Sequence, residues 1–385
     1  MPTKTDARLN ETVGRIGSSA PAEAGILSID LSAVTANYRL VQKKASSARV
    51  GAVVKADAYG LGARTIAPVL ADAGCRDFFV AHLAEAMELV SCLSGSARLY
   101  VLNGLAPGME SLCADARIFP VLNTLEQARD WQRHAAGIGR KLPAVLQVDT
   151  GMSRLGLGAD ELETLLREPG FLDWVELRVV MSHLACADIP GATANAEQVR
   201  RFADMAACVP EAERSLANSA AALGMPDHVG DLVRPGLVLY GIDPLSGATT
   251  GLHSAIALDA RVIQVRSVPA GVGVGYDHDY VTQSPRRLAT LSVGYADGWP
   301  RALGGKGAVW MNGVRLPLVG RVSMDTCTAD VTELPEGSLQ PGDTVELIGP
   351  HQSVLELAIQ LDTAPHAVLT GLGKRFEKRF TSHAL

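Results

Sequence analysis

The residue with the clearest chemical potential is Lys55, which ends the apolar run 50–54 and precedes the loop Tyr59-Gly-Leu-Gly62. The apolar run predicts that the amine of this lysine is poorly solvated. Desolvation and nearby cations lower the pKa of an amine, and the neutral amine is a nucleophile suited to Schiff-base formation. A lysine at a strand end can also simply extend its stem into solvent. The adjacent glycines favour a ligand site, because small residues let the backbone approach a ligand closely.

Two further segments could bind a phosphate group. Asn218-Ser219 end the seventh of eight strand-like runs, and Gly236-Leu237 lie in the eighth. Barrel proteins often build phosphate sites here, from loop N–H groups and a hydroxyl. An isolated Asn-Ser pair is also a common helix cap. A phosphorylated cofactor beside a Schiff-base lysine points to pyridoxal phosphate.

The elements that must position these residues alternate along the first 245 residues. Short runs rich in β-branched or aromatic residues alternate with Ala/Leu/Glu-rich stretches typical of helices. The eight runs are 50–55, 78–81, 99–102, 118–122, 144–149, 179–183, 215–219 and 233–240. They predict a closed parallel (β/α)8 barrel of the TIM type, with an open doubly wound sheet as the competing fold. The active site of such a barrel lies at the carboxyl ends of its strands.

The chain of 385 residues is too long for one ordinary core, and its pattern changes after the barrel. Residues 246–385 form short strand-like runs between Gly, Pro, Asn and Asp turns, and Asn312-Gly313 predicts a hairpin. We therefore expect a cofactor-binding barrel over 25–245 and a mostly β domain over 246–385. A strand at 26–30 lies outside the barrel count and is a candidate to join the second domain. Residues 1–24 are a polar leader and a candidate for disorder.

The composition narrows the class of partner and the compartment. A net charge of −6 and a pI near 5.9 disfavour nucleic acid and anionic membranes. No apolar run approaches the ~18 residues of a membrane span, and the leader lacks the apolar core of a secretory signal. The six cysteines contain no CxxC pair, which disfavours a disulfide framework or a metal site. We expect a cytoplasmic protein without a bound metal.

Eight segments resemble, in order, the motifs of bacterial alanine racemases, which are pyridoxal-phosphate-dependent enzymes of fold type III. One such motif is weak evidence, whereas eight in order are specific. They lie between about residues 50 and 330, which is most of the chain. The matching segments are 53–62, 148–154, 182–188, 217–219, 233–241, 275–276, 294–298 and 320–325.

The resemblance implies that L- and D-alanine are interconverted by a two-base mechanism on a pyridoxal phosphate aldimine. Lys55 would carry the cofactor and act on one face of the substrate Cα, and Tyr276 of the partner subunit would act on the other. Racemisation needs two opposed groups, because one removes a proton and the other returns one. A tyrosine has an unperturbed pKa near ~10, so it needs polar or cationic neighbours to act as a base. His183 and Arg234 would supply them, and the enzyme would be a homodimer with shared sites.

The resemblance also implies roles for the remaining residues. Arg154 would bind the phenolic oxygen of the cofactor and the substrate, and Arg234 would face the pyridine nitrogen. Met324 would offer its backbone N–H to the substrate carboxylate. The other implied cofactor-binding residues are Tyr59, His183, Asn218, Ser219, Gly236 and Leu237. Residues resembling those of the access channel are Asp188, Tyr295, Arg301 and Arg321.

The chain departs from the family pattern at two places. Many members have a lysine, open to carbamylation, where this chain has Gln147. We expect the Gln147 carbonyl oxygen, or a bound anion such as chloride, to orient Arg154 instead. Many members also have a tyrosine near the C-terminus, whereas the stretch 369–374 here has no aromatic residue. Acceptance of serine or another small amino acid is therefore left open, as is a biosynthetic or catabolic role.

Two other functions compete with the racemase. Decarboxylases of basic amino acids share the barrel and β domain, but carry a Cys-Asp pair where this chain has Ser323-Met324-Asp325. Single-barrel proteins that only carry the cofactor lack a second domain, whereas more than 130 residues follow the barrel here. Both comparisons favour the racemase.

Overall fold

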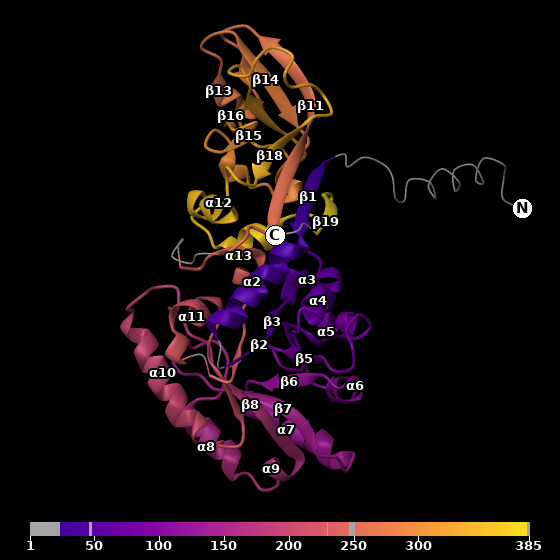
Figure 1. Cartoon of the computed structure of the whole chain (residues 1–385), viewed down its shortest axis with the longest axis vertical. Coiled ribbons are helices and arrows are strands. Elements are labelled where there is room, and N and C mark those ends of the chain that lie inside the picture. The colour runs from indigo at the N-terminus through magenta and orange to yellow at the C-terminus, as the bar shows by residue number, and fades with distance from the viewer. Residues whose placement is uncertain (1–23, 46–47, 229, 246–250, 383–385) are drawn as a thin grey trace, which may run out of the picture. The chain divides into compact units, whose positions relative to one another are not determined.

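The computed structural model describes residues 24–45, 48–228, 230–245 and 251–382 (Figure 1). The expected polar leader therefore lies, apart from its last residue, outside the described residues. The chain forms two compact units. Of the described residues, the barrel unit contains those within 29–256, 354–370 and 380–382. The β unit contains 24–28, 257–353 and 371–379.

A ring of parallel strands forms the centre of the barrel unit. Seven strands pair in sequence order, from β3 to β9. β10 pairs in parallel with β2, and the Arg234 N–H donates to the Ala217 carbonyl just after β9 at 2.9 Å. Because β2 and β3 are two parts of one strand, the ring closes, and the predicted TIM-type barrel is confirmed over the open sheet. The strands are β2 Arg49–Val50, β3 Ala52–Val53, β4 Asp77–Val80, β5 Arg98–Val101, β6 Phe119–Leu122, β7 Leu142–Gln147, β8 Val175–Met181, β9 Glu213–Ser215 and β10 Leu232–Val233.

Amphipathic helices surround this ring (Figure 1). In α7, Ala128, Trp131 and Ala135 are buried at helical spacing, and the Thr124 side chain caps the first turn. The other helices of the barrel unit up to α11 also bury apolar side chains. They are α2 Leu31–Lys44, α3 Lys55–Tyr59, α4 Ala63–Asp72, α5 Leu83–Val90, α6 Glu110–Asp115, α7 Leu125–Gly137, α8 Ala159–Arg167, α9 Phe171–Trp174, α10 Thr193–Ala206 and α11 Ser219–Gly224.

Two late helices return to the barrel unit after the β-rich segment. The sequence also predicts a helix near residues 354–361, which α12 Val354–Gln360 confirms, whereas α13 Pro365–Gly371 was not predicted. α12 belongs to the barrel unit, and so does α13 as far as Thr370. The barrel unit therefore contains side chains that lie more than 100 residues beyond its last strand.

The β unit is built on one sheet of order β14-β17-β16-β15-β18-β11-β1-β19, in which β14 also pairs with β11. The strand expected near residue 26 is β1, which lies between β11 and β19 in this sheet. Asn312 and Gly313 both have positive φ and join β15 to β16, as the hairpin prediction requires. The predicted mostly β second domain is confirmed. The strands of the chain outside the barrel are β1 Gly25–Asp30, β11 Ile256–Val268, β12 Gly273–Val274, β13 Tyr280–Val281, β14 Arg286–Leu291, β15 Ala308–Met311, β16 Val314–Val319, β17 Cys327–Asp330, β18 Thr344–Ile348 and β19 Glu377–Thr381.

No helix in the part of the chain that the structure describes is long and apolar enough to span a membrane.

Candidate active site

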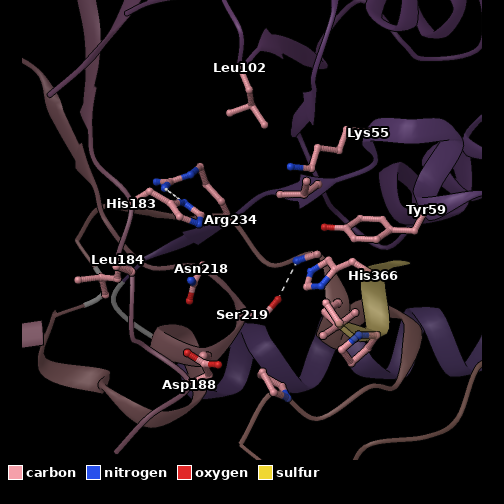
Figure 2. Close-up of a pocket in the computed structure, with 18 of the residues that line it drawn as sticks. Lys55, Tyr59, Leu102, His183, Leu184, Asp188, Asn218, Ser219, Arg234 and His366 are labelled. Atoms are coloured by element: carbon pink, nitrogen blue, oxygen red, sulfur yellow. Dashed lines mark hydrogen bonds between the residues drawn. The ribbon is translucent and has the colours of Figure 1, made fainter. Parts of the chain in front are cut away.

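A cavity of about 930 Å³ opens at the carboxyl ends of the barrel strands, and all of its lining residues belong to the barrel unit. Figure 2 shows side chains from several strands pointing into it. The structure thus brings together the site residues that the sequence places in the barrel. They are Lys55, Tyr59, Arg154, His183, Asp188, Asn218, Ser219, Arg234, Gly236 and Leu237.

Lys55 follows β3 and begins an unusual left-handed turn. Ala56, Asp57, Ala58 and Tyr59 all have φ between 53° and 60°. L-residues rarely adopt this conformation and it is strained, so neighbouring contacts must hold it in place. The Asp57 carboxylate accepts a hydrogen bond from the Ala63 N–H at 2.7 Å, and a Glu85 oxygen accepts one from the Ala56 N–H at 3.3 Å. Both Lys55 and Tyr59, at the two ends of the turn, line the cavity.

The environment of Lys55 favours a neutral amine. Burial lowers the pKa of this lysine most strongly, and the cations Arg154 and Arg234 lower it further. Glu85 opposes them but does not outweigh them. A neutral amine is the form that attacks a carbonyl carbon or accepts a proton. The desolvated nucleophile expected from the sequence is therefore present.

Arg234 and His183 form a buried polar pair on the opposite wall (Figure 2). The Arg234 side chain donates to the Ser215 hydroxyl at 2.5 Å and to the Ser182 carbonyl at 2.6 Å, and it faces His183 Nδ1 at 3.4 Å. Burial lowers the pKa of Arg234 to about 10, so it remains a cation at neutral pH. Burial, then Arg234, Arg154 and Lys55, lower the pKa of His183 to about 3. The imidazole is therefore neutral and can accept a hydrogen bond from Arg234.

Another wall has the features of a phosphate cradle. The Ser219 hydroxyl accepts a hydrogen bond from the Gly236 N–H at 2.9 Å, and Leu237 begins a 3-10 helix, Leu237–Tyr240, so its N–H has no partner within that helix. A Cβ on Gly236 would lie 2.2 Å from the Tyr59 hydroxyl, so only glycine fits there. Burial raises the pKa of Tyr59, which keeps its hydroxyl protonated as a donor. Asn218 also caps α11 through the Ala221 N–H at 3.1 Å, so the helix cap and the cradle share one turn.

Arg154 lines the cavity, but its guanidinium has no hydrogen-bond partner within the described ranges. The Gln147 side chain donates to the Leu155 carbonyl at 3.2 Å and does not bind Arg154. The expected hydrogen bond from Arg154 to the Gln147 carbonyl oxygen is absent among the described residues, and only the Nε2 end of this amide is engaged, by the Leu155 carbonyl. The alternative of a bound anion stays a prediction. The loop is organised by Asp149, whose carboxylate accepts the N–H groups of Gly151, Met152 and Ser153.

The other predicted site residues belong to the β unit and do not line this cavity. Tyr276 is 67% exposed and Met324 is 53% exposed, on two separate turns. Arg321 forms ion pairs with Asp277 and Asp279, beside Tyr276. The two remaining channel residues, Tyr295 and Arg301, are also exposed.

Sequence analysis missed His366, which comes from α13 and lines the cavity (Figure 2). Its ring lies 5.5 Å from the Tyr59 ring, centroid to centroid. The sequence carried no local signal for it, because His366 stands far beyond the barrel strands in a segment assigned to the second domain.

Comparisons with known proteins agree over both units. The family model "Alanine racemase, N-terminal domain" matches residues 29–244, and "Alanine racemase, C-terminal domain" matches residues 255–380. An alanine racemase of Brucella canis is 49% identical over 370 residues, which cover 93% of this chain and 93% of the relative. A protein of Agrobacterium fabrum named as a catabolic alanine racemase is 46% identical over 362 residues, covering 94% and 93%.

Solved structures show the same likeness. An alanine racemase of Bartonella henselae with covalently bound pyridoxal phosphate has a TM-score of 0.90 and 42% identity, and the match covers 94% of this chain and 100% of that one. An alanine racemase of Streptomyces lavendulae has a TM-score of 0.88 and 31% identity, covering 95% and 99%. The barrel unit and the β unit are thus similar to the two domains of one kind of protein.

Proposed function

Since the chain belongs to the alanine racemase family and interconverts L- and D-alanine with pyridoxal phosphate, we propose that Lys55 and the partner subunit's Tyr276 exchange the proton on the substrate Cα. The observation that carries this proposal is the cavity that Lys55, whose pKa is lowered by burial, shares with a phosphate cradle and the buried Arg234. Borohydride reduction of the loaded protein should fix a pyridoxyl group to the peptide containing Lys55. Labelling of a different lysine would contradict the assignment.

The residues present fit this cofactor. Tyr59, Ser219, Gly236 and Leu237 would hold its phosphate in a cradle that a Cβ on Gly236 would fill. They offer two hydroxyls and two N–H groups, of which the Gly236 N–H donates to the Ser219 hydroxyl in this structure. Asn218 would keep Ser219 in place through its helix cap. Arg154 would bind the phenolic oxygen, and its guanidinium has no competing hydrogen bond to the described residues. When bound, the cofactor supplies an electron sink that acidifies the substrate Cα.

Arg234 would face the pyridine nitrogen. Its pKa, about 10 in the buried site, keeps it cationic at neutral pH, so it can donate a hydrogen bond but cannot supply a carboxylate-like acceptor. A cation at this position would keep the nitrogen unprotonated, and the cofactor would then supply only a weak electron sink. A weaker sink limits the lifetime of charge at Cα and so disfavours side reactions such as transamination.

The two proposed proton-transfer groups would act on opposite faces of the substrate. Lys55 Nζ, whose pKa is lowered by burial and by the nearby arginines, would accept or return the proton on one face. His183 Nδ1 faces Arg234, which leaves the proton of the neutral ring on Nε2. An Nε2–H donated to the phenolic oxygen of the partner subunit's Tyr276 would stabilise its deprotonated form. The proposed pair would thus let a tyrosine act as a base.

We propose that the active unit is a homodimer with shared sites. The support is that Tyr276 and Met324 are exposed on the β unit, although they resemble residues that contact substrate. Asp188 of the barrel would then form the access channel with Tyr295, Arg301 and Arg321 of the partner subunit. Sedimentation of the loaded protein should give twice the chain mass, and an active monomer would contradict the proposal.

Alanine is the substrate of the family, and serine or another small amino acid is a candidate for a slower second substrate. Family membership favours racemisation over decarboxylation of basic amino acids. An interconversion assay over small amino acids measures the substrate range directly.

We further propose that the protein acts in the cytoplasm and forms D-alanine. All six cysteines are free, which fits a reducing compartment. Rescue of a D-alanine-requiring bacterial strain would support the biosynthetic direction, and failure with active protein present would favour the catabolic role named for the Agrobacterium relative.

A further inference from the structure

The His366 side chain of α13 packs on the ring of Tyr59, which is proposed to bind the cofactor phosphate. Its imidazole lies 5.5 Å from the Tyr59 ring at an interplanar angle of 35°. It lines the cavity together with Ser219, Gly236 and Leu237. Figure 2 shows the ring of His366 beside Ser219 and below the Tyr59 hydroxyl. The position is therefore at the phosphate end of the cavity.

The Tyr59 ring is held between two aromatic neighbours. It packs on the buried Tyr240, with ring centroids 5.1 Å apart, and on His366, with ring centroids 5.5 Å apart. Its hydroxyl lies so close to Gly236 that no Cβ fits between them. His366 is thus in ring contact with a residue whose hydroxyl is already directed at the cradle.

The backbone around His366 is also fixed. A Cβ on Gly60, in the loop that follows Tyr59, would lie 3.1 Å from the Leu369 carbonyl oxygen. Leu369 and Val368 of α13 are buried. The left-handed turn that carries Tyr59 and the helix that carries His366 therefore pack directly on each other. This packing holds the backbone of α13 in place, so that His366 has a fixed position in the cavity wall.

The charge state of His366 suits a hydrogen-bond donor beside Lys55. Burial lowers the pKa of His366, and the nearby Lys55 lowers it further. The neutral ring keeps one N–H and adds no positive charge near the reactive amine. An N–H donated to an ionised phosphate is stronger than one donated to a neutral acceptor.

We propose that His366 is a further cofactor-binding residue, whose imidazole steadies the Tyr59 ring and donates a hydrogen bond to the phosphate of pyridoxal phosphate. This proposal rests on the phosphate cradle given under the proposed function. It assigns a binding role to a residue that lies outside the barrel strands in the sequence and reaches the cavity only through α13.

The test compares the cofactor with pyridoxal, which lacks the phosphate. The holoenzyme is stripped with a carbonyl reagent and reloaded, and the dissociation constants of both compounds are measured by absorbance. His366→Phe keeps a ring on Tyr59 without the N–H, His366→Gln keeps a donor, and His134→Ala on α7 is a control outside the cavity. Ser219→Ala and Tyr59→Phe test the cradle itself.

We expect His366→Phe to raise the dissociation constant of pyridoxal phosphate about 10-fold, as for loss of a charge-assisted hydrogen bond. The dissociation constant of pyridoxal should rise less than about 2-fold. His366→Gln should recover part of the loss, and His134→Ala should change neither constant. If the cradle variants reduce the preference for the phosphorylated compound and His366→Phe does not, the role of His366 is wrong. If none of the three variants reduces it, the phosphate cradle of the proposed function is wrong as well.

Discussion

Two sets of residues resemble the site residues of alanine racemases, one in the barrel cavity and one on exposed turns of the β unit. The two sets differ in burial and in the charges around them. In the barrel, Arg234 is 4% exposed and the pKa values of Lys55 and His183 are lowered by burial and neighbouring charge. In the β unit, Tyr276 is 67% exposed. This difference supports the proposal that the barrel unit alone binds the cofactor, and that Tyr276 acts only when the surface of another subunit covers it.

Loss of Lys55 should have the largest effect. Lys55→Ala removes the only amine that lines the described cavity, so racemisation should fall by about 10⁴-fold or more. The loaded protein should also lose the absorbance of the covalently bound cofactor, because Lys55 is no longer there to form the link. Initial rates in both directions and an absorbance spectrum measure the two effects. Substantial activity in Lys55→Ala would show that the barrel cavity is not the reactive site.

Tyr276→Phe should reduce racemisation without changing cofactor binding. Racemisation should fall by about 10² to 10⁴-fold in both directions, because a positioned acid/base group is lost. Cofactor affinity should not change, because Tyr276 does not line the barrel cavity. Exchange of the Cα proton with deuterated water should survive for the one enantiomer that presents its proton to Lys55. Equal loss of exchange for both enantiomers would argue against two opposed groups.

Gly236→Ala should damage the barrel side alone. The new Cβ would lie 2.2 Å from the Tyr59 hydroxyl, and the Tyr59 ring is held between Tyr240 and His366. We expect cofactor affinity to fall by about 10-fold and the free energy of unfolding to fall by about 1–3 kcal/mol, as for overpacking. Gly95→Ala is the control, since nothing lies within 4 Å of its Cβ position. Equal behaviour of the two variants would show that the cradle is not close-packed.

Asp297→Asn should loosen the β unit alone. The Asp297 side chain is 0% exposed, pairs with Arg375 and accepts the Gly294 N–H at 2.9 Å, next to the turn of Tyr295. Because the Tyr295 N–H donates to Ser323 beside Met324, we expect KM for alanine to rise roughly 3- to 10-fold with unchanged cofactor affinity. Asp325→Asn, the exposed partner of the same Arg375, should have a smaller effect. A larger effect of Asp325→Asn would contradict this order.

The smallest predicted effect is a shift in pH dependence. Lys55 reacts when its amine is neutral, so the rate of cofactor loading should rise with pH through a pKa below the ordinary 10.5. Arg154 lowers this pKa and Glu85 raises it. Arg154→Gln should therefore move the midpoint to higher pH, and Glu85→Gln should move it to lower pH. Shifts in the same direction would show that charge at these positions does not control Lys55.

The barrel and most of its cavity could be predicted from the sequence, because both depend on local patterns. Alternating strand and helix patterns predict the ring, and the ring brings the carboxyl ends of its strands together. Lys55, His183 and Arg234 could therefore be assigned to one site from their places in the chain.

What could not be predicted depends on long-range packing or side-chain choice. α13 packs on the loop after Tyr59 although some 300 residues separate them in the chain, so His366 was missed. Four successive non-glycine residues in the left-handed region, 56–59, contradict their ordinary propensity and are held by tertiary hydrogen bonds. The Gln147 side-chain amide can either donate or accept a hydrogen bond, and only the structure shows that its Nε2 donates to the Leu155 carbonyl.

The central claim is that each site joins the barrel of one subunit to the β unit of another, and subunit mixing tests it most directly. Lys55→Ala and Tyr276→Ala subunits are each inactive as homodimers, and are mixed in equal amounts under conditions that allow exchange. Random pairing makes half of the dimers mixed, with one intact site in each, so about a quarter of the wild-type activity should return. If subunits exchange, as mass-tagged chains would report, and no activity returns, each site is built within a single chain and the account is wrong.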